Sequence, residues 1–134
     1  MQSATQTAPV SKKMLWTGRI ISALPVLMLL FSGILKLLKP ASIVVEFNRL
    51  GYSESAIVGI GILEILCALI YAIPRTSILG AILLTGYLGG AVATHVRIDD
   101  TFDKLIGPFI PAVLAWLGIF LRDNRLRALL PLRS

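Results

Sequence analysis

The stretch IVGIGILEILCALIYAIPRTSILGAILLTGYLGGAVATHV, residues 57–96, holds two apolar runs separated only by the four residues PRTS. The runs cover residues 57–73 and 78–96, and each approaches the ~20 residues that a membrane-spanning helix needs. A connection this short joins antiparallel neighbours. This stretch therefore predicts two membrane helices in a hairpin, with a single carboxylate, Glu64, inside the first of them.

Two further apolar runs lie on either side of the hairpin, at residues 15–38 and 105–121. The first is too long for a signal peptide and is interpreted as a retained helix, with a bend at Pro25. The last carries Pro108 and Pro111 in its first turns, where proline is best tolerated. The chain of 134 residues is 56% hydrophobic, with a mean hydropathy of +0.83, which is more apolar surface than one small soluble core can bury. The predicted fold class is all-α: one integral membrane four-helix bundle.

The segment KPASIVVEFNRLGYSES, residues 39–55, connects the first two spans. Ile43, Val44, Phe47 and Leu50 recur in it at helical spacing beside polar residues. We expect a short amphipathic helix in the membrane interface or capping the bundle.

The predicted domain organisation has three parts: a disordered cytoplasmic tail at 1–13, a transmembrane domain at 14–121 and a basic cytoplasmic tail at 122–134 that contacts anionic lipid. Eight of the thirteen Lys and Arg residues would then lie on the side of the two termini. Basic residues favour the cytoplasmic side, so both termini are predicted to be cytoplasmic.

Composition also limits the kinds of binding and redox site that the chain can form. The net charge of +6 lies at helix ends and tails, not in a basic groove on a soluble module, so nucleic-acid binding is not predicted. Cys67 and His95 are the only residues of their types, which leaves no dithiol pair and no His/Cys ligand set. No metal and no cofactor are predicted.

Four ionisable residues converge on the outer half of the predicted bundle: Lys36, Glu64, His95 and Arg97. An ionised carboxylate inside a span is costly, so Glu64 is expected to face inward. It is interpreted either as a packing constraint or as a ligand-binding or proton-handling group. Lys36 has the alternative of reaching the outer interface, and His95 that of an interfacial residue.

Small residues predict close helix packing in two places. Gly33 and Gly61 lie beside Lys36 and Glu64, and Gly86, Gly89, Gly90 and Ala93 form a stripe on the third span. Arg97 lies on the side of this stripe, and His95 lies on nearly the opposite face of a straight helix. Whether the stripe packs within one chain or against another is left open.

Several motifs together resemble one family. They are G-x-x-K-L in FSGILKLLKP (31–40), G-x-x-E ending at Glu64, I-P-R-T at the hairpin and G-G-A-x-x-T-H-x-R ending at Arg97. The chain resembles the DoxX-like family of small four-helix membrane proteins from Phe31 to the end of the fourth span. The resemblance implies a location in the bacterial inner membrane and no bound cofactor. It marks Lys36, Glu64, Arg75, His95 and Arg97 as signature residues without an established catalytic role.

Three functions follow as hypotheses. The preferred one is a non-catalytic accessory or assembly subunit, which would contact the bilayer and a protein partner or a second copy of the chain. The second is a binding or transport protein for a quinone, a lipid or an anionic ligand near Glu64 and Lys36. The third is a membrane subunit of a quinone-linked oxidoreductase complex, a role that the resemblance includes among its relatives.

Overall fold

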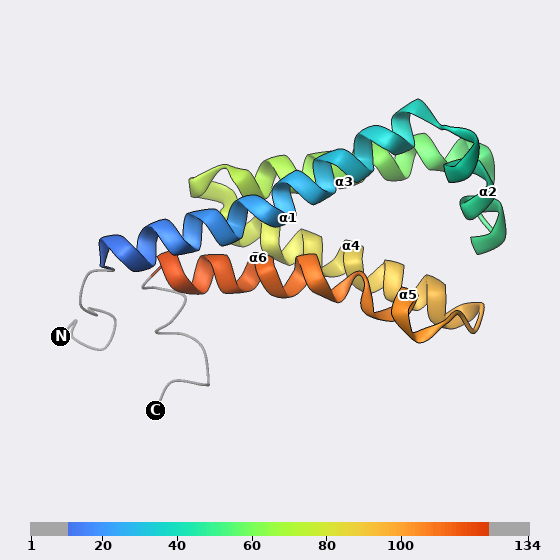
Figure 1. The fold of residues 1–134 in the computed structure, drawn as a ribbon. Coiled ribbons are helices and arrows are strands. Elements are labelled where there is room, and N and C mark those ends of the chain that lie inside the picture. Colours follow the sequence, from blue (N-terminus) through green and yellow to red (C-terminus); the bar gives the residue numbers. More distant parts are fainter. Residues whose placement is uncertain (1–10, 124–134) are drawn as a thin grey trace.

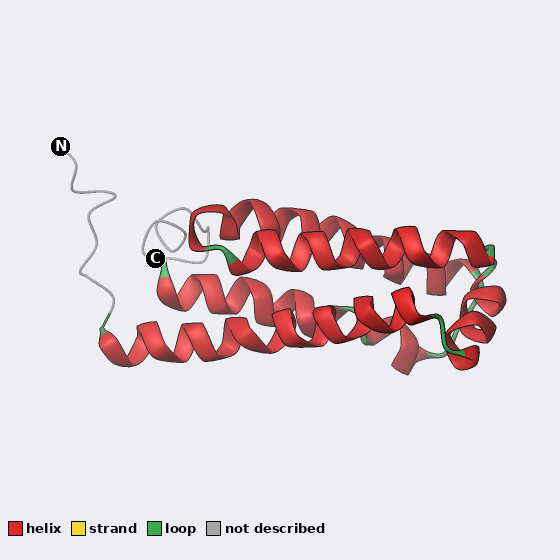
Figure 2. Cartoon of the chain, turned by 90° about the horizontal axis from the view of Figure 1, so that it is seen from above, coloured by secondary structure: helices red, strands yellow, loops and turns green. Residues whose placement is uncertain are grey.

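The computed structural model describes residues 11–123, and every regular element in that range is a helix (Figures 1 and 2). In chain order the elements are α1 (Lys12–Leu38), α2 (Ala41–Leu50), α3 (Glu54–Ala72), η1 (Pro74–Thr76), α4 (Ser77–Arg97), α5 (Phe102–Ile106) and α6 (Phe109–Arg122). Four stretches are long and apolar enough to cross a membrane: 12–38, 54–72, 74–97 and 102–122. At most 33% of each apolar window is buried inside the chain, which leaves the remainder for lipid. The predicted all-α class and the four spans are confirmed.

The first and last spans lie side by side, and α1 also packs along α3. The hairpin of α3 and α4 is joined through η1, and α4 has a smaller contact with α6. The start of α1, the end of α6 and η1 share one end of the bundle, called the inner end after the predicted orientation (Figure 1). The helix α2 and the α4–α5 connection lie at the opposite, outer end (Figure 1).

The first helix begins slightly earlier than its apolar run. The Ser11 hydroxyl accepts a hydrogen bond from the Met14 N–H at 3.1 Å and caps α1. Lys12 and Lys13 are therefore helical, although the predicted tail extends to residue 13. The α1 helix continues through Pro25 as far as Leu38. The remainder of the two predicted tails, residues 1–10 and 124–134, lies outside the described residues.

The apolar run predicted at residues 105–121 lies within the span of residues 102–122, which consists of two helices in succession. The structure divides this span into α5 and α6, with Gly107 and Pro108 between them. Proline has no N–H to donate to the preceding turn, and glycine has a low helix propensity, so the helix ends there and a new one begins at Phe109.

Glycines set the closest approaches between helices. A Cβ on Gly80 of α4 would lie 2.4 Å from the backbone N and Cα of Tyr71 in α3. A Cβ on Gly118 of α6 would lie 2.1 Å from the Ser22 hydroxyl of α1. The hydrophobic core consists of Leu29, Cys67, Ala68, Tyr71, Ala81, Leu84, Leu88, Ala115 and Ile119. These two glycines therefore allow close contacts of α4 with α3 and of α6 with α1.

Candidate functional site

The contact of α1 with α3 brings Lys36 and Glu64 together. A Cβ on Gly33 would lie 2.5 Å from the Ile65 side chain, and one on Gly61 would lie 2.8 Å from the Cβ of Lys36. The two helices come this close because both positions lack a side chain. The register of this contact places Lys36 beside Glu64.

Lys36 and Glu64 form a buried ion pair. The Lys36 Nζ lies 2.7 Å from Glu64 Oε1, and their side chains are 12% and 3% exposed. The Lys36 ammonium also donates to the Ser32 hydroxyl at 2.7 Å, and this hydroxyl donates to Glu64 Oε1 at 3.3 Å. The carboxylate thus faces inward, and its charge is balanced by one cation.

The ammonium group of Lys36 also lies at the wall of a cavity of about 490 Å³, which we call the outer pocket. The pocket is open to the surroundings, and its lining comes from α1, α2, α3 and α4. The lining residues are Lys36, Ile43, Glu46, Phe47, Leu50, Tyr52, Ile60, Leu63, Gly86, Tyr87, Gly90, Ala91, Thr94 and His95. Most of this lining is apolar. Its polar side chains are those of Lys36, Glu46, Tyr52, Tyr87, Thr94 and His95.

Aromatic and hydroxyl groups are the further polar features of the outer pocket. The Nζ of Lys36 lies 5.9 Å from the centroid of the Phe47 ring, a cation–π distance. The hydroxyls of Tyr52 and Thr94 are hydrogen-bonded at 3.0 Å. Tyr87 lies near enough to Glu64 for the two groups to interact electrostatically. The pocket therefore offers hydrogen-bonding groups within an apolar wall.

Residues from both sides of α4 line the outer pocket. Gly86 and Gly90 lie at one edge of the pocket-facing side of α4 and His95 at the other, with Thr94 among the lining residues between them. Gly86, Gly90 and His95 thus all border the outer pocket, because the pocket covers about half of the circumference of α4. His95 and Gly86 thus lie on opposite edges of α4, as their spacing indicates, and both edges border the outer pocket.

The stripe does not pack within the described chain. A Cβ on Gly86, Gly89 or Gly90 would meet no atom within 4 Å among residues 11–123, and Gly89 and Ala93 are exposed outside the pocket lining. Of the two alternatives given above for the stripe, packing within the described part of the chain is therefore not seen.

An acidic residue that sequence reasoning did not single out, Asp100, organises the outer end. Its Oδ2 accepts hydrogen bonds from Arg49 at 2.9 Å and is 2.7 Å from His95 Nδ1. Arg49 also binds Glu46 through two hydrogen bonds, at 3.1 and 2.6 Å. The Arg49 guanidinium is the main cause that lowers the pKa of both carboxyls below their ordinary values. These charges join α2 to the end of α4.

Arg97 and Arg75 lie away from the Lys36–Glu64 pair. The Arg97 guanidinium donates to the Leu50 carbonyl and lies over Gly51, so it holds the end of α2. Arg75 is exposed in η1, at the opposite end of the bundle from α2. Of the five signature residues, the structure therefore brings Lys36, Glu64 and His95 to or beside the outer pocket.

One family description matches the chain. The DoxX-like family matches residues 20–118, which contain the second and third spans completely and leave out residues 12–19 of the first span and 119–122 of the last. No curated protein and no solved structure matches the chain.

Proposed function

The chain belongs to the DoxX-like family of membrane proteins, and from this premise we propose that it binds a lipophilic small molecule with a polar head in the outer pocket. The observation that carries the proposal is Lys36 in the lining of a mostly apolar cavity. The preferred hypothesis from the sequence, an accessory subunit, becomes the second candidate.

The size and lining of the pocket support binding of a small molecule. Its volume of about 490 Å³ falls within the range of ~300–1,000 Å³ that is usual for such sites. Ile43, Leu50, Ile60 and Leu63 supply apolar wall. A ligand that enters from the bilayer would leave its apolar part against these side chains.

The ammonium group supports a hydrogen-bond-accepting head. An ammonium carries three N–H donors, and Lys36 uses two of them on Glu64 and Ser32. The third is left for the Phe47 ring or for an oxygen of a ligand. Because Glu64 already balances the charge, a neutral carbonyl group suits the site as well as an anion does. Quinones and lipids both meet this description.

A specific observation favours the second candidate, an accessory or assembly subunit. Gly89 and Ala93 expose backbone and small side chains on a face that no described part of this chain covers. Faces of this composition allow close approach of a partner helix in membranes. A partner protein or a second copy would contact α4 there.

The proposed location is the bacterial inner membrane, with residues 11 and 123 on the cytoplasmic side. The distribution of Lys and Arg supports this orientation. In this orientation the outer pocket opens towards the outer leaflet.

Two neighbouring glycines provide the experiment. Gly90→Leu would place a side chain in the outer pocket, whereas Gly89→Leu would add the same atoms outside it, and both positions have open space for a Cβ. We would release the full chain from membranes in a mild detergent and record native mass spectra of wild type and both variants. The small-molecule proposal expects a bound molecule of a few hundred daltons that Gly90→Leu loses and Gly89→Leu keeps.

A second matched pair of variants tests the role of the Glu64 charge. Glu64→Gln alters the buried pair, and Glu54→Gln makes the same change at a residue that is 60% exposed on the same helix. The bound molecule should be lost or weakened in the first variant only. A chain without bound small molecules in all variants, with a protein partner or a dimer lost in Gly89→Leu, contradicts the pocket and supports the accessory subunit.

A further inference from the structure

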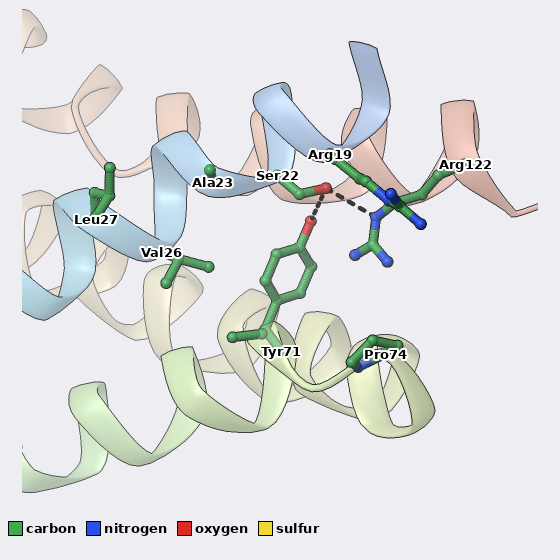
Figure 3. A pocket seen from close by; sticks show the side chains of 9 residues that line it. Arg19, Ser22, Ala23, Val26, Leu27, Tyr71, Pro74 and Arg122 are labelled. Carbon is green, nitrogen blue, oxygen red and sulfur yellow. Dashed lines mark hydrogen bonds between the residues drawn. The ribbon is translucent and has the colours of Figure 1, made fainter. Parts of the chain in front are cut away.

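A second cavity lies at the inner end of the bundle and carries two arginines. This inner pocket has a volume of about 400 Å³ and is separate from the outer pocket in its residues. Arg19 and Arg122 lie together at one end of it, and Val26 and Leu27 lie at the other (Figure 3). The remaining lining residues are Ser22, Ala23, Tyr71, Ala72 and Pro74.

Arg122 is held in place by neutral groups. Its Nε donates to the Ser22 hydroxyl at 3.0 Å, and its Nη2 donates to the Ser77 hydroxyl at 3.3 Å. The centre of the guanidinium lies 5.7 Å from the centroid of the Tyr71 ring. The Tyr71 hydroxyl donates to the Ala115 carbonyl at 2.7 Å and lies 3.1 Å from the Ser22 oxygen (Figure 3). Side chains of α1, α3 and α4 thus hold the Arg122 guanidinium of α6 in place without a ligand.

The positive charge of the inner pocket has no anionic partner in the described chain. The ion pairs among residues 11–123 involve neither Arg19 nor Arg122. Among the described residues, the guanidinium of Arg19 stacks only on Trp16, at 5.2 Å from the ring centroid. A guanidinium has five N–H donors, and Arg122 uses two of them on the serines. Two cations that share one cavity with free donors are suited to an anion.

The other half of the pocket is apolar and lies along the membrane-facing side of α1. Ala23, Val26 and Leu27 follow Arg19 at spacings of four, seven and eight residues, which is one face of a helix. The twenty residues from Arg19 to Lys39 rise about 30 Å in a helix, close to the thickness of the hydrocarbon core. With Lys39 near one surface of the membrane, Arg19 therefore lies near the other, at the depth of lipid phosphates.

We propose that the inner pocket binds an anionic phospholipid. Arg19 and Arg122 contact its phosphate, and an acyl chain lies along Ala23, Val26 and Leu27. Bidentate contacts of guanidinium groups with phosphate oxygens provide the affinity, and the apolar groove selects an ester that carries an acyl chain over free phosphate. Because Arg19 belongs to α1 and Arg122 to α6, the bound lipid joins the first and last spans.

The test uses an arginine outside the pocket as its control. Arg19→Gln removes one phosphate contact and breaks no hydrogen bond seen in the described chain. Arg75→Gln removes the same charge from the same end of the bundle, at an exposed position outside the lining. We would titrate the full-length protein in detergent with dioleoylphosphatidylglycerol and with dioleoylphosphatidylcholine, and measure lipid binding by native mass spectrometry.

Wild type and Arg75→Gln should bind phosphatidylglycerol in preference to phosphatidylcholine, and Arg19→Gln should lose about fivefold in affinity for phosphatidylglycerol. An equal loss in Arg75→Gln, or no preference between the lipids in wild type, would overturn the proposal. A third arm titrates inorganic phosphate: binding of phosphate that depends on Arg19, without a matching dependence for the lipid, would assign the site to a soluble anion instead. The outer pocket is unaffected by either variant, so this test and that of the proposed function can fail independently.

Discussion

At the scale of single residues, the behaviour of Lys36 depends on Glu64. The two charges are 2.7 Å apart and almost fully buried, so each offsets part of the cost of burying the other. The sequence predicted that Glu64 faces inward, because a carboxylate in contact with lipid is too costly. It could not predict the Ser32 hydroxyl bridge, since that depends on the register between α1 and α3.

A double-mutant cycle measures this dependence. Lys36→Met and Glu64→Gln should each destabilise the protein by about 3 kcal/mol, because each leaves a buried charge without its partner. The double variant should cost clearly less than the sum of the two. The measurement is unfolding of the purified protein in mixed micelles of detergent and increasing dodecyl sulfate.

The control cycle uses Lys39→Met and Glu54→Gln. This pair lies 3.5 Å apart and is largely exposed, so its coupling should be near zero. Equal coupling in the two cycles would show that burial does not matter for the Lys36–Glu64 pair.

The carboxyl groups of the outer end give a pH dependence. Arg49 holds the pKa of Asp100 and of Glu46 below the ordinary values of 3.8 and 4.5. A lowered pKa in the folded state means that the stabilisation is complete above the ordinary values and is lost as the pH falls through the folded ones. Hydrogen exchange of the 97–101 segment should therefore be slow, after correction for the intrinsic rate, at pH 5 to 7, and faster below about pH 4.

Asp100→Asn provides the matched comparison, since it should already show fast exchange at neutral pH. Sequence reasoning missed Asp100 because its neighbour Asp99 reverses the chain with a φ of 54°. This reversal brings the Asp100 side chain back to His95, and nothing in the loop composition indicates it.

At the scale of helices, the apolar runs predicted each span to within a few residues, because hydrophobic length decides where a chain can cross a membrane. The division of the last span at Gly107 and Pro108 was missed because proline is also tolerated in the first turn of a helix. The stripe on α4 shows a different limit of sequence reasoning. Small residues indicate that a close approach is allowed, but the glycine that makes the contact with α3 is Gly80, outside the stripe.

Two glycine substitutions compare a glycine that contacts a neighbouring helix with a glycine that has open space around it. Gly80→Ala should destabilise the bundle by about 2 kcal/mol or more, because the new Cβ would overlap the backbone of Tyr71. Gly59→Ala should stabilise it by up to ~1 kcal/mol, since Gly59 is an exposed helical position with open space. Unfolding in mixed micelles measures the stability of both variants. If Gly59→Ala destabilised the protein as much as Gly80→Ala, the close packing of α3 on α4 could not be the cause of the Gly80→Ala effect.

At the scale of the whole molecule, composition alone predicted a protein of the bilayer, and four spans followed from counting apolar runs. The orientation rests on a modest excess of basic residues at one side. The order of the helices around the bundle could not be predicted, because side contacts between membrane helices depend on small residues and hydrogen bonds instead of on hydrophobicity.

Cysteine labelling tests the orientation. The thiol of Cys67 is buried, and Cys67→Ala removes it as a background reaction. In that background Ser55→Cys and Arg75→Cys each place one thiol at an exposed position, at opposite ends of the bundle. In intact cells a membrane-impermeant maleimide should label the cysteine at 55 and not the one at 75, and the reverse pattern would invert the proposed orientation.

The pairing of α1 with α6 has a consequence for how the protein is made. The ribosome delivers the first span long before the last, yet Gly18 and Ser22 find their contacts on Gly118 and Arg122. Until translation is nearly complete, the Ser22 hydroxyl has Tyr71 of α3 as a partner but not Arg122 of α6. The final helix then completes the bundle, so a chain that ends before residue 109 would leave Gly18 and Ser22 without their contacts on α6.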